Sequence, residues 1–258
     1  MRIAVLLKEV PDTYGERKLD LQTGLADRGA TDAVLDEIGE RALEVALTYA
    51  DEHPGTQVTV VSMGPETAVS CLRKGLAMGA TDAMHIVDDG LLGADLSLTA
   101  EVLAAALKRN QFDLVVAGNL STDGSGGVLP AMLAELLAVP HLTSLSSVSI
   151  DESEVSGRRA TEVGVASIKA DLPAVISVTE TLPPPRFPNF KGIIASKKKP
   201  LATLTLNDLG VDPTDESAGR SIVIAVGERP ARQAGIKIVD EGDAAERLAE
   251  YLVTNRLA

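Results

Sequence analysis

Short apolar runs alternate with amphipathic stretches four times within the first 140 residues of this 258-residue chain. The runs that predict buried strands are residues 2–7, 57–63, 83–87 and 114–117. The stretches that place apolar residues at helical spacing are residues 36–50, 65–78, 95–109 and 129–139. Such alternation is typical of an α/β fold with a doubly wound, mostly parallel sheet, and we expect that architecture here.

The pattern changes near residue 144. Short strand-like runs between residues 144 and 179, the first over residues 144–150, predict a small antiparallel addition and then a return to the main sheet. Residues 180–200 contain five prolines, so they cannot be regular structure throughout. The acidic C-terminal stretch ends in an amphipathic pattern over residues 243–254, which predicts an extended arm with one short helix.

Two of the predicted loops are expected to face each other. Ligands of open α/β sheets bind beyond the carboxyl ends of the strands, where the strand order reverses. The loops after the first and fourth predicted strands are Lys8–Asp12 and Gly118–Gly127. Glycines in the second loop let backbone amides approach an anion, and the helix that follows favours negative charge at its start. This loop matches neither G-x-G-x-x-G nor a Walker A motif, so phosphate binding and a plain connection both stay open.

Composition argues against several classes of function. The formal net charge of −13 disfavours nucleic acid or anionic lipid as a general partner. The single cysteine, Cys71, excludes an intrachain disulfide, and the three histidines lie far apart without a nearby nucleophile. No apolar run reaches the roughly 18 residues of a membrane span, and no export signal is recognisable. We therefore expect no catalytic residues and no metal site, and instead a binding or electron-carrying role.

Several long segments resemble the β subunits of electron transfer flavoproteins. They are VLLKEVPD, DEIGERALEVAL, VSMGPETA, LRKGLAMGATDA, AGNLSTDGSGGVLPAMLAELLAVP and LPAVISVTETLPPPRFPNFKGIIASKKKP. These segments follow one another in the family's order across residues 2–211. Several long motifs in register are far more specific than any single loop, so the chain is identified as a member of this family by resemblance.

The resemblance implies a heterodimer in which an α subunit holds most of one redox-active FAD. This chain would bind AMP or, as in a bifurcating branch of the family, a second FAD in the same pocket. It also implies a nucleotide-binding domain over residues 1–211 and an arm over residues 212–258 that contacts the α subunit. The implied nucleotide contacts are Leu6, Asp36, Glu37, Ile38, Gly39, Met63, Gly118, Asn119, Leu120, Ser121, Thr122, Asp123, Gly124, Ser125, Gly126, Gly127, Val128 and Leu129.

A recognition loop at about residues 170–192 is implied as well. In it Leu182 would enter an apolar pocket of an acyl-CoA dehydrogenase-like donor, with Pro185 and Arg186 beside it. Electrons from fatty acid β-oxidation would then pass to a membrane quinone oxidoreductase and the respiratory chain. A cytoplasmic setting in bacteria, or an organelle matrix, is the compartment that the resemblance implies.

The sequence departs from the family in one loop, and two other classes of protein must be considered. The loop reads TDGSGG where the family has larger polar residues, and Pro130 stands where glycine is usual. This loop leaves more room than AMP needs, so AMP, which we favour, and a second FAD stay open. A stand-alone adenine-nucleotide-binding protein of the universal-stress type would lack the ETLPPPRFPNF segment. A hydrolase or transferase would need a nucleophile and a base, and none is found.

Overall fold

The protein is described from a computed structural model that covers residues 1–258 except 16–17, 216, 232–234 and 258. The chain divides into two compact units, Met1–Ile224 and Ala225–Ala258. The first unit contains a seven-stranded sheet in the order β12-β5-β4-β1-β6-β11-β7. Its strands are β1 (Arg2–Leu6), β4 (Gln57–Met63), β5 (Asp82–Ile86), β6 (Leu114–Gly118), β7 (His141–Leu145), β11 (Ala174–Val178) and β12 (Leu201–Leu204).

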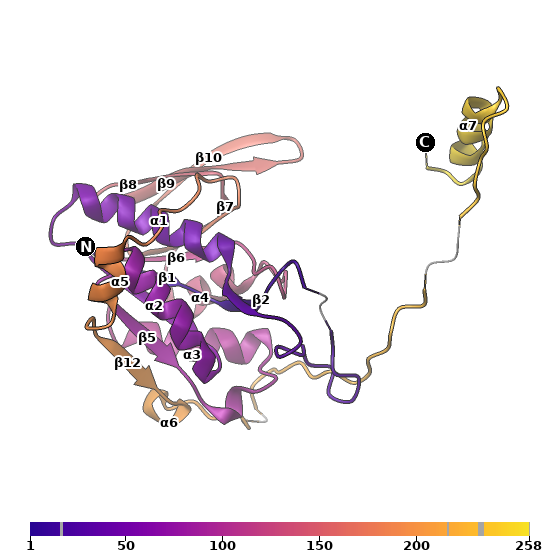
Figure 1. The fold of residues 1–258 in the computed structure, drawn as a ribbon. Helices are drawn as coiled ribbons and strands as arrows, with labels where there is room; N and C mark the ends of the chain where they lie inside the picture. Colours follow the sequence, from indigo (N-terminus) through magenta and orange to yellow (C-terminus); the bar gives the residue numbers. More distant parts are fainter. Residues whose placement is uncertain (16–17, 216, 232–234, 258) are drawn as a thin grey trace. The chain divides into compact units, whose positions relative to one another are not determined.

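Every pairing within this sheet is parallel, and the doubly wound α/β expectation is confirmed. β1 pairs with β4 on one side and with β6 on the other, so the strand order reverses at β1 (Figure 1). These are the first and fourth strands that the sequence predicted. Their loops therefore leave the sheet side by side, at the position where α/β proteins bind ligands.

Helices cover both faces of the sheet. Successive side chains of a strand point to opposite faces, and β1 places Ile3 in one core cluster and Ala4 in the other. The first cluster includes Leu43 of α1 (Glu37–Glu52) and Leu72 of α2 (Val69–Met78). The second includes side chains of α3 (Leu96–Lys108) and α4 (Leu129–Leu137). Short 3₁₀ turns, η1 (Glu66–Ala68) and η2 (Asp89–Leu91), precede α2 and α3.

The antiparallel addition is also confirmed. β8 (Ser147–Ile150), β9 (Glu154–Thr161) and β10 (Gly164–Asp171) form a separate antiparallel sheet (Figure 1). β11 then returns to the main sheet, where it pairs with β6 and β7. The single strand expected over residues 144–150 is wrong in detail. Its first part belongs to β7. The chain changes sheets at Ser146, since Leu145 before it pairs with β11 and Ser147 after it pairs with β9.

Several short elements had no clear pattern in the sequence. A two-stranded antiparallel sheet, β2 (Glu9–Pro11) with β3 (Ala33–Leu35), lies between β1 and α1. The proline-rich stretch contains α5 (Phe190–Ser196), and the side chain of Asn189 caps this helix by accepting from the Gly192 amide at 2.8 Å. It is followed by β12, which pairs with β5, and by α6 (Leu206–Leu209).

The first unit extends beyond the boundary expected at residue 211. Residues 220–223 lie on it through an Arg220–Glu101 ion pair and a 2.6 Å bond from the Ser221 amide to Asp95. The second unit contains α7 (Ala244–Thr254), close to the predicted helix, with Leu248, Tyr251 and Val253 exposed. None of the helices that the structure describes has the length and apolarity that crossing a bilayer requires.

Candidate functional site

The carboxyl ends of β1 and β6 lie side by side where ligands of open α/β sheets bind, and we call this region the crevice. Leu6 ends β1 and Gly118 ends β6, and the two strands are paired directly through Val5 and Val116. Met63 ends β4, the neighbour of β1 on the other side. The side chains of Leu6, Met63 and Leu129 are partly buried against the same core cluster. The topology thus brings together predicted contacts that are more than 120 residues apart in the sequence.

Asp36 joins the first turn of α1 to the loop after β6. It caps α1, and its Oδ1 accepts from the Ile38 amide at 3.0 Å. Its Oδ2 accepts from the amide and the hydroxyl of Thr122, at 2.7 and 2.8 Å. The residue is only 3% exposed, so these bonds are sheltered from water. Asp36 was predicted as a nucleotide contact, and the structure places it as the link that holds the two sides of the crevice together.

Of the two predicted glycine contacts near the start of α1, one is needed for its close approach to the strand ends. A Cβ atom on Gly118 would lie 3.0 Å from Cγ2 of Ile38, closer than side chains normally come. A Cβ on Gly39 would lie 3.7 Å from the carbonyl oxygen of Leu6, an ordinary contact distance. Only Gly118 is therefore required by packing. It allows the start of α1 to rest against the end of β6.

The loop between β6 and α4 offers its backbone to solvent. Residues 124–128 are exposed, and two of them have left-handed backbone, Ser125 at φ 51° and Gly127 at φ 67°. Within the described chain the amides of Gly126 and Gly127 donate to no protein acceptor. Val128, which precedes α4, gives the helix no side-chain cap. Uncapped amides at a helix start attract anions, so this loop can accept a phosphate group.

A cluster of charged side chains lies at the end of this loop that is nearer to β6, and it joins the loop to the residues after β1. The ammonium of Lys8 lies 2.8 Å from Oδ1 of Asp123 and 3.2 Å from the Ser121 hydroxyl. The guanidinium of Arg28 lies 3.1 Å from Oδ2 of Asp123. Burial acts to raise the pKa of Asp123, but bonds from Lys8 and Ser121 and the charges of Lys8 and Arg28 outweigh it, and the pKa falls to about 2.

The cluster contains residues that the sequence prediction did not include. Lys8 stands in a predicted facing loop but was not named as a contact, and Arg28 carried no signal. Arg28 lies between β2 and β3, and 95 residues separate it from Asp123. It reaches the crevice because its guanidinium also donates to the carbonyl of Glu9 at 3.3 Å. Only the path of the chain between the two short strands could have revealed this contact.

The predicted recognition residues lie elsewhere, on the proline-rich segment. Leu182 was expected as an exposed anchor, yet its side chain is only 8% exposed and belongs to the core cluster beneath α1. Arg41 of α1 donates to its carbonyl oxygen. The cause is the direction of the chain after β11, which turns back over α1 and carries Leu182 inward. In this conformation Leu182 packs within its own chain.

Arg186 is occupied in the same way. Its guanidinium pairs with Glu44 and with Asp51, both of α1, at 2.9 Å each. Hydrogen bonding to Glu44 is the main cause that raises the pKa of Arg186, and burial opposes it. Pro185 lies half-buried beside it. Together Leu182 and Arg186 clamp the segment onto α1.

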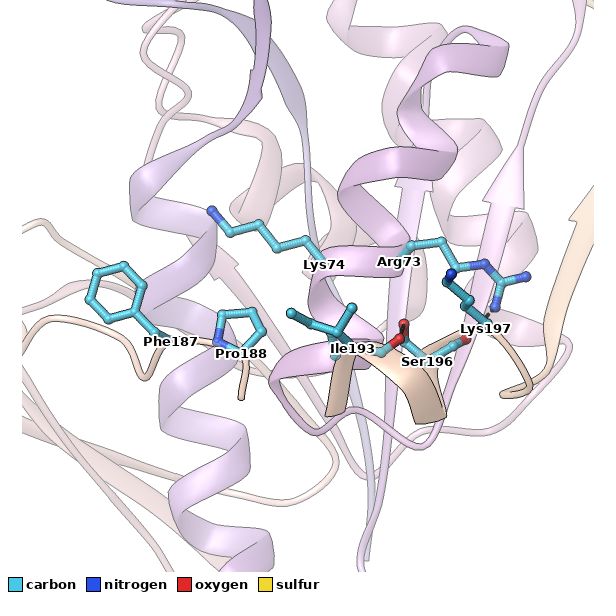
Figure 2. A pocket seen from close by; sticks show the side chains of 8 residues that line it. Arg73, Lys74, Phe187, Pro188, Ile193, Ser196 and Lys197 are labelled. Carbon is cyan, nitrogen blue, oxygen red and sulfur yellow. Dashed lines mark hydrogen bonds between the residues drawn. The ribbon is translucent and has the colours of Figure 1, made fainter. Parts of the chain in front are cut away.

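A groove lies beside this segment, between α2 and α5. Its volume is about 610 Å³, and Ala77, Phe187, Pro188 and Ile193 provide its apolar lining. Figure 2 shows Phe187 and Pro188 approaching from the proline-rich segment, with Ile193 on α5 and Arg73, Lys74 and Lys197 around the rim. Phe187 is 93% exposed, an unusual state for an aromatic side chain. The groove is thus an apolar surface, and of its three edge cations Lys74 is paired with Glu40 and Arg73 donates to the carbonyls of Ser196 and Lys199.

Three consecutive lysines, Lys197, Lys198 and Lys199, follow α5, and they are not all solvated. Lys199 points inward, and its ammonium donates to the carbonyl of Leu76 at 3.0 Å and to that of Ala80 at 2.5 Å. Burial lowers the pKa of this lysine. Lys199 therefore ties the segment to the end of α2. The sequence could not separate it from its two neighbours, because all three residues are identical.

Comparison with known proteins identifies the family. The model of the electron transfer flavoprotein domain matches residues 23–209, which include the loop after β6 and the proline-rich segment. This chain belongs to the electron transfer flavoprotein family. The match confirms the family resemblance read from the sequence, and it supports an electron-transfer flavoprotein role.

Individual relatives extend over almost the whole chain. The chain is 46% identical to the electron transfer flavoprotein subunit beta of Mycobacterium leprae, over 99% of this chain and 98% of the relative. It is 34% identical to the subunit beta of Bacillus subtilis, over 98% and 96%. It is also 36% identical to the caffeyl-CoA reductase-Etf complex subunit CarD of Acetobacterium woodii, over 83% and 81%. The subunit naming of these relatives implies an α-subunit partner in a heterodimer.

Proposed function

We propose that this chain is the nucleotide-binding β subunit of a heterodimeric electron carrier. It accepts electrons from flavin dehydrogenases of the acyl-CoA dehydrogenase type, as in fatty acid β-oxidation, and passes them toward a membrane quinone oxidoreductase. The FAD shared with the α subunit supplies the electron transfer. The residues of this chain bind AMP, keep the two subunits together and present a surface to the redox partner.

The open loop after β6 is the observation that supports AMP binding. The free amides of Gly126 and Gly127 and the uncapped start of α4 fit a phosphate group. The apolar side chains of Leu6, Met63 and Leu129 lie at the same edge and suit the flat face of a base. Asp36 keeps both sides of the pocket in place. Polar donors at one end and apolar groups at the other match a nucleoside monophosphate.

A second FAD in this pocket is the alternative. Gly124, Gly126 and Gly127 carry no side chains and are exposed, so the loop leaves room for a ligand larger than AMP. The similarity to a subunit of a reductase-Etf complex keeps this alternative in view. The absorbance of the purified heterodimer separates the two. One flavin per heterodimer supports AMP, whereas two flavins per heterodimer would assign the pocket to FAD.

The second compact unit is our candidate for the contact with the α subunit. Its helix α7 exposes Leu248, Tyr251 and Val253, and an exposed apolar face of this kind marks a partner surface. Residues 212–224 belong to the first unit, so the contact is assigned to residues 225–258. A chain that ends at Ile224 should keep its fold but fail to form the heterodimer. Unchanged heterodimer affinity after this truncation would refute the assignment.

The partner surface is assigned to the proline-rich segment and the groove beside it. Leu182, Pro185 and Arg186 serve recognition by holding the segment on α1, because their side chains are buried or paired there. A direct contact of Leu182 with a partner would require its side chain to leave the core. The exposed side chain of Phe187 is accessible without such a change. A partner surface with an apolar side chain at its centre fits this groove.

Co-expression with an α subunit tests the whole proposal. The expected product is a yellow heterodimer whose flavin is reduced by an acyl-CoA dehydrogenase and its substrate. A colourless homodimer that binds adenine nucleotide would instead support the universal-stress alternative. A yellow heterodimer that no flavin dehydrogenase reduces, although dithionite reduces it, would refute the assigned donors and leave the subunit assignment intact.

A further inference from the structure

The cluster of Lys8, Arg28 and Asp123 has an unusual distribution of exposure. The carboxylate side chain is 10% exposed, whereas the side chains of Lys8 and Arg28 are 42% and 44% exposed. Two cations thus reach solvent around one sheltered anion. The cluster carries one net positive charge within a chain whose formal charge is −13. This positive charge lies at the crevice, beside the open loop.

We propose that Lys8 and Arg28 form an anion subsite for the ligand's phosphate group, and that Asp123 occupies this subsite when no ligand is bound. The inference rests on the proposed nucleotide site, whose open loop lies beside the cluster. It adds two side chains, one of them from the segment between β2 and β3, to a site otherwise made of backbone. It also gives Asp123 a role that opposes binding.

The donors around Asp123 are those that bind phosphate. Oδ1 accepts from the ammonium of Lys8 at 2.8 Å and from the amide of Gly124 at 2.7 Å. Oδ2 accepts from the guanidinium of Arg28 at 3.1 Å. An ammonium, a guanidinium and a loop amide are charge-assisted or anion-binding donors, and a phosphate oxygen can replace each carboxylate oxygen. In the structure Asp123 accepts from all three donors.

A purely structural role for the cluster makes the opposite prediction. If Asp123 only tethers the segment around Arg28 to the loop, its loss would disorder the loop and weaken nucleotide binding. If it occupies the anion subsite, its loss removes a competing negative charge and strengthens binding of the phosphate. The sign of the change therefore separates the two roles, and adenosine, which lacks the phosphate, serves as the internal reference.

The experiment is displacement of radiolabelled AMP from the complete heterodimer by unlabelled AMP or by adenosine. The readout is the ratio of the two half-displacing concentrations, adenosine over AMP. Asp123→Asn should raise this ratio about tenfold, the effect of removing one unit charge near a partly exposed anion. Arg28→Gln should lower it about tenfold for the same reason. Arg158→Gln changes an exposed arginine on β9 and should leave the ratio unchanged.

A disordered loop would weaken the binding of adenosine and AMP together, so the ratio still reports on the subsite. A ratio that falls in Asp123→Asn, or that stays unchanged in both Asp123→Asn and Arg28→Gln, overturns the subsite while the AMP site stands. If the wild-type heterodimer binds no labelled AMP, the proposed AMP site is refuted, and the subsite is refuted together with it. A rise of the ratio in Asp123→Asn together with a fall in Arg28→Gln supports the subsite.

Discussion

The crevice and the proline-rich segment use polar interactions in opposite ways. In the crevice, Asp36 and Asp123 hold loops together from inside while the backbone of the β6–α4 loop faces solvent. In the segment, Leu182 and Arg186 hold the chain onto α1 while the side chain of Phe187 faces solvent. The crevice exposes backbone amides of the β6–α4 loop, and the proline-rich segment exposes the ring of Phe187. The crevice thus suits a small anion, and the segment suits a protein.

The difference also shows where each site depends on the fold. The crevice is placed by the strand order, since β1 and β6 are neighbours and their loops meet. The proline-rich segment is placed by individual clamps, Leu182 and Arg186, rather than by the strand order. Substitutions in the exposed β6–α4 loop should therefore change nucleotide binding, and a crevice substitution should cost stability only where it removes a linking carboxylate such as Asp123. Substitutions of the clamps should change stability first.

The largest expected effect comes from Leu182→Ala. This change removes a buried side chain from the core, and the free energy of unfolding should fall by about 2–5 kcal/mol. Urea unfolding of the heterodimer measures it, with Phe187→Ala, which alters a 93% exposed side chain, as the control. If the urea midpoint of unfolding is unchanged while the dehydrogenase reduces the flavin more slowly, Leu182 contacts the partner instead of packing in the core.

The next effect is on the nucleotide. Gly127→Val forces a β-branched residue into left-handed backbone at φ 67° and crowds the open loop. AMP should be lost from the purified heterodimer by about tenfold or more, since strain of this kind costs about 1–3 kcal/mol. Gly210→Val is the matched control, because its φ of 66° imposes the same strain at the end of α6. Equal AMP loss in both variants would mean that strain alone, and not the crevice, is responsible.

Acid should weaken the crevice through Asp123. Its pKa is depressed from 3.8 to about 2 in the folded protein, so its contribution to stability is complete above about pH 5 and is lost as pH falls through 2. The contribution corresponds to about 2 kcal/mol at neutral pH. Unfolding of wild type and Asp123→Asn at pH 7 and pH 3 measures it. The gap between them should shrink to about half at pH 3, and a constant gap would contradict the depressed pKa.

The smallest effect is expected at the groove. Phe187→Ala should slow dehydrogenase-driven reduction of the flavin about fivefold at limiting protein concentration, because a large exposed apolar contact is removed. Reduction by dithionite and the midpoint of unfolding should not change. Phe190→Ala removes another exposed ring, one that does not line the groove, and serves as the control. Identical partner-driven rates for Phe187→Ala and wild type would move the partner surface away from the groove.

The fold and the place of the crevice could be predicted from the sequence. Strand and helix periodicity is local, and the rule for ligand sites in open α/β sheets led to the expectation that the loops after β1 and β6 face each other. The observed strand order places these two strands side by side. The link from Asp36 to Thr122 and the contact of Arg28 with Asp123 join residues 86 and 95 positions apart. No periodic pattern encodes such pairs. The glycines of the loop could be recognised from the sequence because the groups expected to bind an anion are backbone amides, which need no distant partner residue.

The proline-rich segment was less predictable for a physical reason. Proline restricts the backbone but does not say which side chain turns inward, and that depends on Arg41 and Glu44 of α1. Leu182 was therefore expected outside and lies inside. α5 escaped prediction because only seven residues form it, too few for a helical period to stand out.

The nucleotide content of the purified heterodimer tests the central claim most directly. The claim is that the backbone of the β6–α4 loop, open at Gly126 and Gly127, binds a nucleotide phosphate. Denaturation and chromatography of the released nucleotides should give one AMP and one FAD per heterodimer for wild type, and FAD with little AMP for Gly127→Val. A wild-type heterodimer that releases neither AMP nor a second flavin, or a Gly127→Val heterodimer with full AMP content, would contradict the claim.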